Sequence, residues 1–199
     1  MSSRFAFDST AHEYIDIDRD ERLPHITGLL RRAGVIDTEW FSDECRIRGS
    51  AVHRLTADYD LQSFTKADIP ELVSPYKPWL VAHVGLCDLL GPTWLMVEEA
   101  LIHPYWRFGG RPDRVGEFDG VLTITEVKSG PPDTWHGIQL ALQAILVGQE
   151  MKLPPEQIQR WGWYLKANGK GKRVPYTDLQ DFSKAYRILS DHCETEAAA

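Results

Sequence analysis

The stretch RPDRVGEFDGVLTITEVKSG, residues 111–130, decides the expected fold and carries the most informative chemistry. Residues 120–128 alternate in side-chain character like a β-strand and are followed by a turn-forming SGPP segment. Side chains two positions apart lie on the same face of a strand, so Glu126 and Lys128 share a face with the apolar Ile124. An ordinary strand would carry apolar residues at these two positions. An acid and a base there indicate that this end of the strand has a function.

The preceding segment, residues 107–117, contains three glycines and can pair with this strand as a hairpin. That pairing can bring Asp113 beside Glu126. Two adjacent carboxylates repel each other unless a cation lies between them, and oxygen ligands with open positions suit Mg²⁺ or Mn²⁺. Lys128 can orient a water molecule or stabilise charge on a phosphate oxygen. The pattern indicates metal-assisted phosphodiester hydrolysis, and a surface salt bridge on a hairpin is the simpler alternative.

Several short motifs flank this stretch in a fixed order. They are LPHITGLL at 23–30, RGSAVH at 48–53, GRPD at 110–113, EVKSG at 126–130 and QLALQ at 139–143. Together they resemble the PD-(D/E)XK nuclease superfamily, and more narrowly its RecB-like and phage exonuclease-like branch. The resemblance covers roughly residues 5–165, and the joint order of the motifs is far more specific than any one of them.

The resemblance implies a restriction-endonuclease-like core and a metal-dependent DNA nuclease. It implies an exonuclease that acts at DNA ends, of a phage or mobile-element type. Asp113, Glu126 and Lys128 would be catalytic. One or two Mg²⁺ or Mn²⁺ ions would be held by His53, Asp113, Glu126 and the carbonyl of Val127.

Three further residues are candidates of the site. Gln139 is expected to contact DNA or the attacking water from a helix over 134–149, and Gln143 is a weaker candidate because relatives carry tyrosine there. Glu98 is a second weak candidate, since relatives often have a glutamate near the metal on the corresponding strand. The alternatives are two solvated glutamines on a helix and a glutamate at a sheet edge.

Other functions stay open at this point. A structure-specific endonuclease or a CRISPR-adaptation-like nuclease would use the same fold. A non-catalytic DNA-binding or assembly subunit belongs to another class. The net charge of −7 counts against the nuclease, because DNA-binding domains are usually basic, and to that extent it argues for the subunit. The retained charges at Asp113, Glu126 and Lys128 oppose it, because a retired site has no need to bury them. Expected partners are DNA and, in addition, a second copy of the chain or a recombination or repair protein.

The composition is that of an ordinary globular protein. The 199 residues are 43% hydrophobic and 26% charged, which predicts one domain over residues 1–199. There is no apolar run of membrane-spanning length and no signal-peptide pattern, so we expect no membrane association and a cytoplasmic location, the host cytoplasm for a phage protein. The three scattered cysteines predict reduced thiols. Some relatives hold an iron–sulfur cluster, which requires four cysteines. Three scattered cysteines cannot supply these ligands, so we expect no iron–sulfur cluster here.

The expected fold class is α/β, a mixed central sheet of roughly five strands flanked by helices. We expect an N-terminal hairpin and helices over 1–90, the catalytic sheet and helix over 93–150, and a C-terminal hairpin and helix over 158–193. Individual elements are predicted by hydrophobic periodicity. They are a hairpin at 4–18, helices at 27–32, 37–59, 78–90 and 134–149, a polar loop at 60–75, and strands at 94–103, 120–128 and 159–167.

Smaller features carry further expectations. Gly49 lies inside the helix over 37–59 at a cost near 1 kcal/mol, which indicates close approach of another backbone or of a substrate. Asp133 is expected to cap the following helix. Thr177 and Gln180 predict a capping box for the last helix, whose tail from Glu194 should fray. The remaining expectations are a surface role for His12 and Tyr14, an internal packing role for His83, inward-facing Trp40, Phe41 and Ile47, and a phosphate-tracking hairpin that carries Lys166, Lys170, Lys172 and Arg173.

Overall fold

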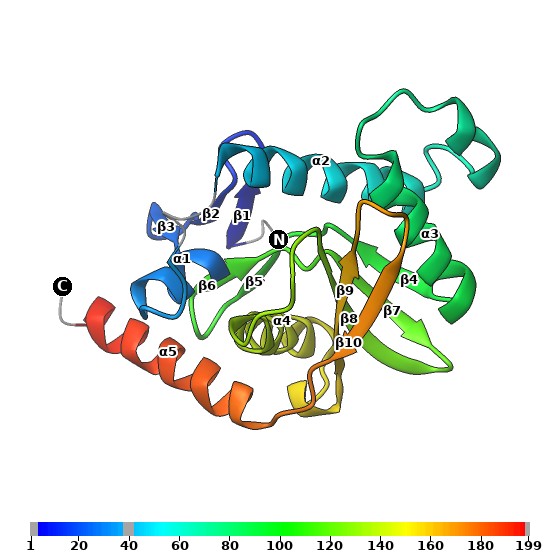
Figure 1. Cartoon of the computed structure of the whole chain (residues 1–199). Helices are drawn as coiled ribbons and strands as arrows, with labels where there is room; N and C mark the ends of the chain where they lie inside the picture. Colours follow the sequence, from blue (N-terminus) through cyan, green and yellow to red (C-terminus); the bar gives the residue numbers. More distant parts are fainter. Residues whose placement is uncertain (1–3, 38–41, 198–199) are drawn as a thin grey trace.

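In a computed structural model, which describes residues 4–37 and 42–197, the centre of the fold is a mixed five-stranded sheet. Its strands are β4 (Thr93–Val97), β7 (Arg114–Phe118), β8 (Val121–Lys128), β9 (Gln159–Leu165) and β10 (Gly171–Pro175). The spatial order is β10-β9-β8-β7-β4, with β8 and β9 parallel and the other neighbours antiparallel (Figure 1). The predicted mixed sheet flanked by helices is confirmed.

Five α-helices and two smaller sheets surround this sheet. The helices are α1 (Ile26–Arg32), α2 (Asp43–Asp60), α3 (Lys77–Leu90), α4 (Trp135–Met151) and α5 (Gln180–Ala197). One small sheet is formed by β1 (Phe5–Asp8), β2 (Glu13–Asp16) and β3 (Glu21–Leu23), the other by β5 (Leu101–His103) and β6 (Phe108–Gly110). Two short 3₁₀ helices, η1 (Lys66–Glu71) and η2 (Pro155–Gln157), complete the described elements. None of the helices in the described part of the chain is long and apolar enough to span a membrane.

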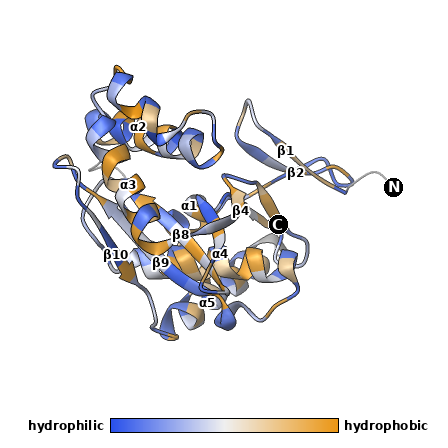
Figure 2. Cartoon of the chain, turned by 90° about the vertical axis from the view of Figure 1, so that its right-hand side faces the viewer, coloured by the Kyte–Doolittle hydropathy of each residue, from blue (hydrophilic) through white to orange (hydrophobic). Residues whose placement is uncertain are grey.

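The two faces of the central sheet bury different helices. Ile124 of β8 packs in one core with α1, α4 and α5, and α4 is buried along its length from His136 to Gly148. Val127 lies on the opposite face of the same strand, and it packs in a second core with α3 and the tryptophan-rich strand β9. Hydrophobic residues therefore gather on α3, α4 and the strands between them (Figure 2). This arrangement fixes the direction of every side chain on β8, because successive residues face opposite cores.

Ion pairs and close packing attach the β1–β3 sheet to the β5–β6 hairpin. Asp16 is fully buried and pairs with Arg4 and with Arg107. The ring of Tyr14 lies on the backbone of Gly109, where an added Cβ would lie 2.2 Å from the ring. Position 109 therefore has room only for glycine unless Tyr14 moves.

Two predicted elements differ in the structure. The strand expected over 94–103 is interrupted, because Glu98 adopts a left-handed backbone conformation (φ 53°) between β4 and β5. The helix expected over 37–59 begins at Asp43, and Ile47, which was expected to face the core, is 61% exposed. Trp40 and Phe41, expected to face inward from the same helix, lie outside the described residues.

Helix ends differ from the prediction as well. Asp133 does not cap α4, whose N-cap is Thr134 without a side-chain hydrogen bond. At the start of α5 the acceptor is the carboxylate of Asp178, 2.9 Å from the amide nitrogen of Gln180, and not Thr177. The last helix continues to Ala197 instead of fraying from Glu194, and the loop over 60–75 contains η1. The strand β3 was not predicted, because three residues with two charged side chains give no apolar alternation.

Candidate active site

The site is built around Asp113, which directly precedes β7. The antiparallel pairing of β7 with β8 brings its carboxylate to the end of β8, where Oδ2 accepts a 2.7 Å hydrogen bond from the amide of Val127. Its other oxygen, Oδ1, lies 3.0 Å from Nδ1 of His53 on α2. Asp113 is only 4% exposed, so the two contacts are made away from bulk water. The Val127 amide thus positions this carboxylate, and a metal-binding role for the Val127 carbonyl stays a prediction.

Glu126 accepts hydrogen bonds on both carboxylate oxygens. Oε1 accepts from Lys128 Nζ at 2.9 Å and from Gln139 Nε2 at 2.6 Å, and Oε2 accepts from Gln143 Nε2 at 2.6 Å. Lys128 also donates to Oε1 of Gln139 at 2.9 Å. The two glutamines lie one turn apart on α4, which explains how both reach the end of β8. Sequence reasoning placed these four residues together, and the structure brings them into one hydrogen-bonded set.

Glu98 joins the site through the break between β4 and β5. One carboxylate oxygen lies 3.7 Å from His53 Nδ1, and the other lies 3.0 Å from Arg111 Nε. Ligand atoms of His53, Glu98 and Asp113 all lie within 4.8 Å of one another. Oε1 of Glu98 is buried and has no hydrogen-bond partner within the described part of the chain. Two positively charged groups lie near this oxygen, Arg114 Nη1 at 3.6 Å and His53 Nδ1 at 3.7 Å, so its burial does not by itself require a metal ion. The imidazole and the two carboxylates are nevertheless donors of the kind that a divalent metal ion binds.

Burial and the neighbouring charges shift the pKa values of His53, Asp113 and Glu126 in different directions. Burial lowers the pKa of His53, but the carboxylates of Asp113 and Glu98 outweigh it and raise the pKa to about 10. Burial and the charge of Glu126 raise the pKa of Asp113. Burial also acts to raise the pKa of Glu126, but Lys128 and His53 hold it below the ordinary value. The carboxylates thus form a focus of negative charge that favours a cation among them, whether imidazolium or metal.

Arg114 holds together the elements that carry the site residues, and the sequence did not predict this role. Its guanidinium is fully buried, donates to the backbone carbonyl of Asp113 at 2.6 Å and pairs with Asp60 on α2. It also donates to Thr56 Oγ1 at 3.2 Å, and that hydroxyl donates to the backbone carbonyl of His53 at 3.0 Å. One side chain therefore links α2, which carries His53, to the strand that begins after Asp113.

A second group of side chains with the spacing of metal ligands contacts Arg114 through Asp60. Ligand atoms of Asp60, His83 and Cys87 lie within 4.8 Å of one another. The carboxylate of Asp60 is already paired with Arg114 and accepts from His83 Nε2 at 2.8 Å. Burial and the charge of Asp60 raise the pKa of the Cys87 thiol, which keeps it protonated. The guanidinium supplies the positive charge here, so this cluster does not require a metal, and His83 is buried in agreement with its expected packing role.

Two hollows border the cluster. The first has a volume of about 260 Å³ and is lined by the N-terminal sheet, α1, Arg111, Gln139 and Gln143. It includes His12 and Tyr14, for which an ordinary surface role was expected. The second, of about 320 Å³, lies between α2 and the start of α4 and reaches His53 and Lys128. The three carboxylates line neither hollow, but side chains that contact them line both.

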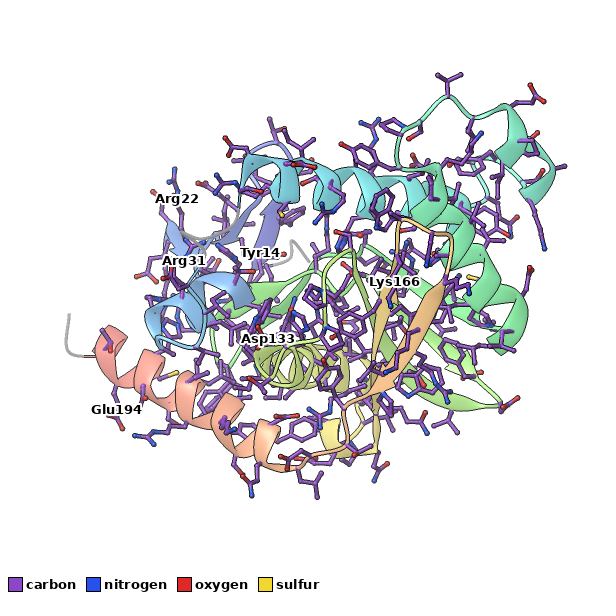
Figure 3. All side chains as sticks on the ribbon, in the orientation of Figure 1. Tyr14, Arg22, Arg31, Asp133, Lys166 and Glu194 are labelled. Carbon is purple, nitrogen blue, oxygen red and sulfur yellow. The ribbon has the colours of Figure 1, made fainter. Side chains whose placement is uncertain are left out.

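The basic hairpin is placed elsewhere. Lys166 lies at the end of β9 and Asp133 at the start of α4 (Figure 3). The turn at Gly169 packs against α3, and the four basic residues of the hairpin are not among the lining residues of either hollow described above. A phosphate-tracking role for this hairpin therefore remains a prediction without a contact to the site.

Comparison with known proteins leaves the family open. No protein-family model matches the sequence, and no curated protein is similar to it. Among solved structures, the chain is similar to one described as "Crystal Structure of LHK-Exo in complex with dAMP". The match has 16% sequence identity and a TM-score of 0.37, and it covers 87% of this chain and 76% of that chain. So distant a likeness carries no argument, and the site is interpreted from its own geometry.

Proposed function

We propose that the protein is a metal-dependent DNA nuclease that hydrolyses phosphodiester bonds. The observation that supports this most strongly is the cluster of His53, Glu98 and Asp113, whose ligand atoms lie within 4.8 Å of one another next to the Glu126–Lys128 pair. A mixed imidazole and carboxylate set beside a lysine is suited to metal-assisted attack on a phosphate.

His53, Asp113 and Glu126, with the Val127 carbonyl, would hold one or two Mg²⁺ or Mn²⁺ ions. Glu98 offers a further oxygen, which Arg111 shares. The metal would supply Lewis-acid activation of the scissile phosphate and of a bound water. The Val127 amide would keep one oxygen of Asp113 oriented, which leaves Oδ1 as the ligand atom.

The work of the other side chains follows from their contacts. Lys128 Nζ is held by Glu126 and Gln139, and an ammonium group has three donors, so one N–H remains for a water or a phosphate oxygen. Lys128 would orient the attacking water and stabilise the charge that develops on the phosphate. Gln139, bonded to both charged groups, would place this donor and contact DNA. Gln143 fixes the second oxygen of Glu126.

At the finer level we propose an exonuclease that acts at DNA ends and belongs to a phage or mobile element. A structure-specific endonuclease or a CRISPR-adaptation-like nuclease remains the alternative within the same chemistry. DNA would be the substrate, with a homo-oligomer or a recombination or repair protein as a further partner. This level rests on the resemblance of the motifs, because the geometry of the cluster does not depend on where a strand is cut.

A non-catalytic DNA-binding or assembly subunit is the competing function. The net charge of −7 counts against the nuclease and agrees with an assembly role, because a body of this charge repels DNA unless cations are bound. The buried Glu126, hydrogen-bonded by Lys128 and both glutamines, opposes it. Such a set costs desolvation and adds nothing to a simple scaffold that an apolar cluster would not.

The test compares linear duplex, circular duplex and single-stranded DNA with Mg²⁺, Mn²⁺ or EDTA. Wild-type protein is expected to cleave linear DNA only, and only with metal. The Lys128→Ala variant should lose about two to four orders of magnitude in rate, the usual contribution of a positioned proton-transfer or charge-stabilising group. Cleavage of circular DNA would favour the endonuclease. Cleavage by the variant at the wild-type rate would contradict the role of Lys128, and no cleavage under any condition would favour the subunit.

A further inference from the structure

The hollow between α2 and α4 is not explained by the chemistry above. Its lining residues include Arg48, Gly49 and His53 from α2, with Lys128, Trp135 and His136 from the end of β8 and the start of α4. The volume of about 320 Å³ lies at the lower end of the range of small-molecule sites, roughly 300–1,000 Å³, and suits one nucleotide unit better than a duplex. Because His53 and Lys128 form part of its wall, it opens on the candidate catalytic cluster.

Gly49 is the first sign that this space is meant for a ligand. A glycine inside an 18-residue helix is unfavourable and indicates close approach of another group. A Cβ built at Gly49 would meet no atom of the described chain within 4 Å. Among the described residues nothing requires glycine at this position, and the same is true of Gly85 inside α3. Gly49 differs from Gly85 because it lines the hollow, where a side chain would take up space that a ligand could occupy.

His136 is the second sign. Its Nδ1 accepts from the backbone amide of Asp133 at 3.1 Å and lies 2.7 Å from the hydroxyl of Tyr164. A backbone N–H can only donate, so Nδ1 carries no proton and the neutral ring has its proton on Nε2. His136 is 5% exposed and lines the hollow. The contacts of Nδ1 leave Nε2–H, on the side of the ring turned away from Tyr164, as the donor available to a ligand.

The third sign is the remaining lining. The Nε atom of Arg48 is buried and has no hydrogen-bond partner among the residues that the structure describes. Lys128 Nζ lies 5.1 Å from the centre of the Trp135 ring, so an aromatic surface borders the cationic end. The lining also contains one carboxylate, that of Asp133, which the cations outnumber. The cations, a neutral N–H donor and an indole ring together complement a phosphate joined to a sugar and base.

We propose that the α2–α4 hollow binds one nucleotide unit of the substrate strand, with its phosphate at His136 and Arg48 and its sugar or base against Trp135. This inference rests on the proposed nuclease function and names the part of the substrate that the site holds. It assigns His136 and Gly49 to substrate binding, separate from the metal ligands.

The experiment measures the binding of a fluorescein-labelled single-stranded DNA of about ten nucleotides in EDTA, by fluorescence anisotropy. Gly49→Leu fills the hollow, and Ser50→Leu is the matched control at the next, exposed position of α2. We expect Gly49→Leu to weaken binding about tenfold or more while its thermal midpoint stays at or above that of wild type. Ser50→Leu should bind as wild type does. Equal affinity of the two variants would overturn the proposal.

A second pair of variants tests the donor. His136→Gln supplies an amide N–H in place of Nε2–H and should keep most of the affinity, whereas His136→Phe keeps the ring shape, has no donor and should lose it. Equal binding by both folded variants would remove His136 from the site. Because binding is measured in EDTA, it is independent of cleavage. If Gly49→Leu weakens binding but the wild-type protein cleaves no DNA, the nuclease function is refuted and the nucleotide-binding hollow is supported. If the wild-type protein cleaves DNA but Gly49→Leu binds as wild type does, the nuclease function is supported and the hollow is refuted.

Discussion

At the scale of single residues, the candidate site consists of side chains proposed to bind the metal ion and of side chains that hold these in place. Glu126 and Lys128 could be named from the sequence because an acid and a base broke the apolar pattern of a strand, and Asp113 because a hairpin could bring it beside Glu126. Arg114 could not, since an arginine after an aspartate is ordinarily a surface residue. The signal that was present is its place at the start of β7, an interior strand of the sheet whose first three residues are all buried.

Arg114 gives a prediction at this scale. Arg114→Met removes the cation from the buried Asp60 and should lower the free energy of unfolding by roughly 3–5 kcal/mol, as measured with a chemical denaturant. The double variant Arg114→Met with Asp60→Asn should recover much of that loss, because the uncompensated charge is gone. A loss below about 1 kcal/mol in the single variant would show that Asp60 does not depend on this partner.

At the scale of elements, the long, strongly patterned segments were predicted well. The strand over 120–128, the helix over 134–149 and the hairpin near residue 169 all lie where periodicity and turn residues placed them. The break at Glu98 could not be read from the sequence, because it depends on the partners that Glu98 gains at the site. The strand β3 was likewise invisible, since its stability comes from pairing with β2.

The attachment of the β1–β3 sheet gives the prediction at the element scale. Gly109→Ala places a Cβ 2.2 Å from the ring of Tyr14, so the sheet must shift. Overpacking of this kind costs about 1–3 kcal/mol, which a denaturation curve resolves. Gly130→Ala is the control, because a Cβ there meets nothing within 4 Å. Equal stability of the two variants would mean that Tyr14 is not held against Gly109.

At the scale of the whole molecule, an acidic chain surrounds a site that collects still more acidic side chains. The net charge of −7 was known from composition, but its distribution was not. Arg4 and Arg107 are drawn to Asp16, and Arg114 to Asp60, so several cations serve the fold and are not free to attract DNA. If the proposed function holds, binding of a divalent metal ion would partly offset the repulsion between the acidic protein and DNA.

The buried Asp16 predicts how the stability of the molecule depends on pH. Hydrogen bonds from Arg4 and Arg107 hold the pKa of Asp16 well below its ordinary value. A depressed pKa stabilises the folded state above the unfolded-state pKa of about 3.9, and this contribution is lost as the pH falls below that value. Asp16→Asn should therefore have a lower thermal midpoint than wild type at pH 7. The difference between the two thermal midpoints should become smaller as the pH falls toward 2–3. A constant difference across this range would contradict the ion pairs.

The proposed nuclease requires that Asp113 and its neighbours bind a divalent cation, and Mn²⁺ binding can be measured without any DNA. Isothermal titration or electron paramagnetic resonance would compare wild-type protein with Asp113→Asn, whose amide keeps the size of the carboxylate but not its charge. We predict saturable Mn²⁺ binding by the wild type that Mg²⁺ displaces, and a loss of at least about tenfold in affinity in the folded variant. Equal binding by the two proteins, or none by the wild type, would contradict the proposed metal site.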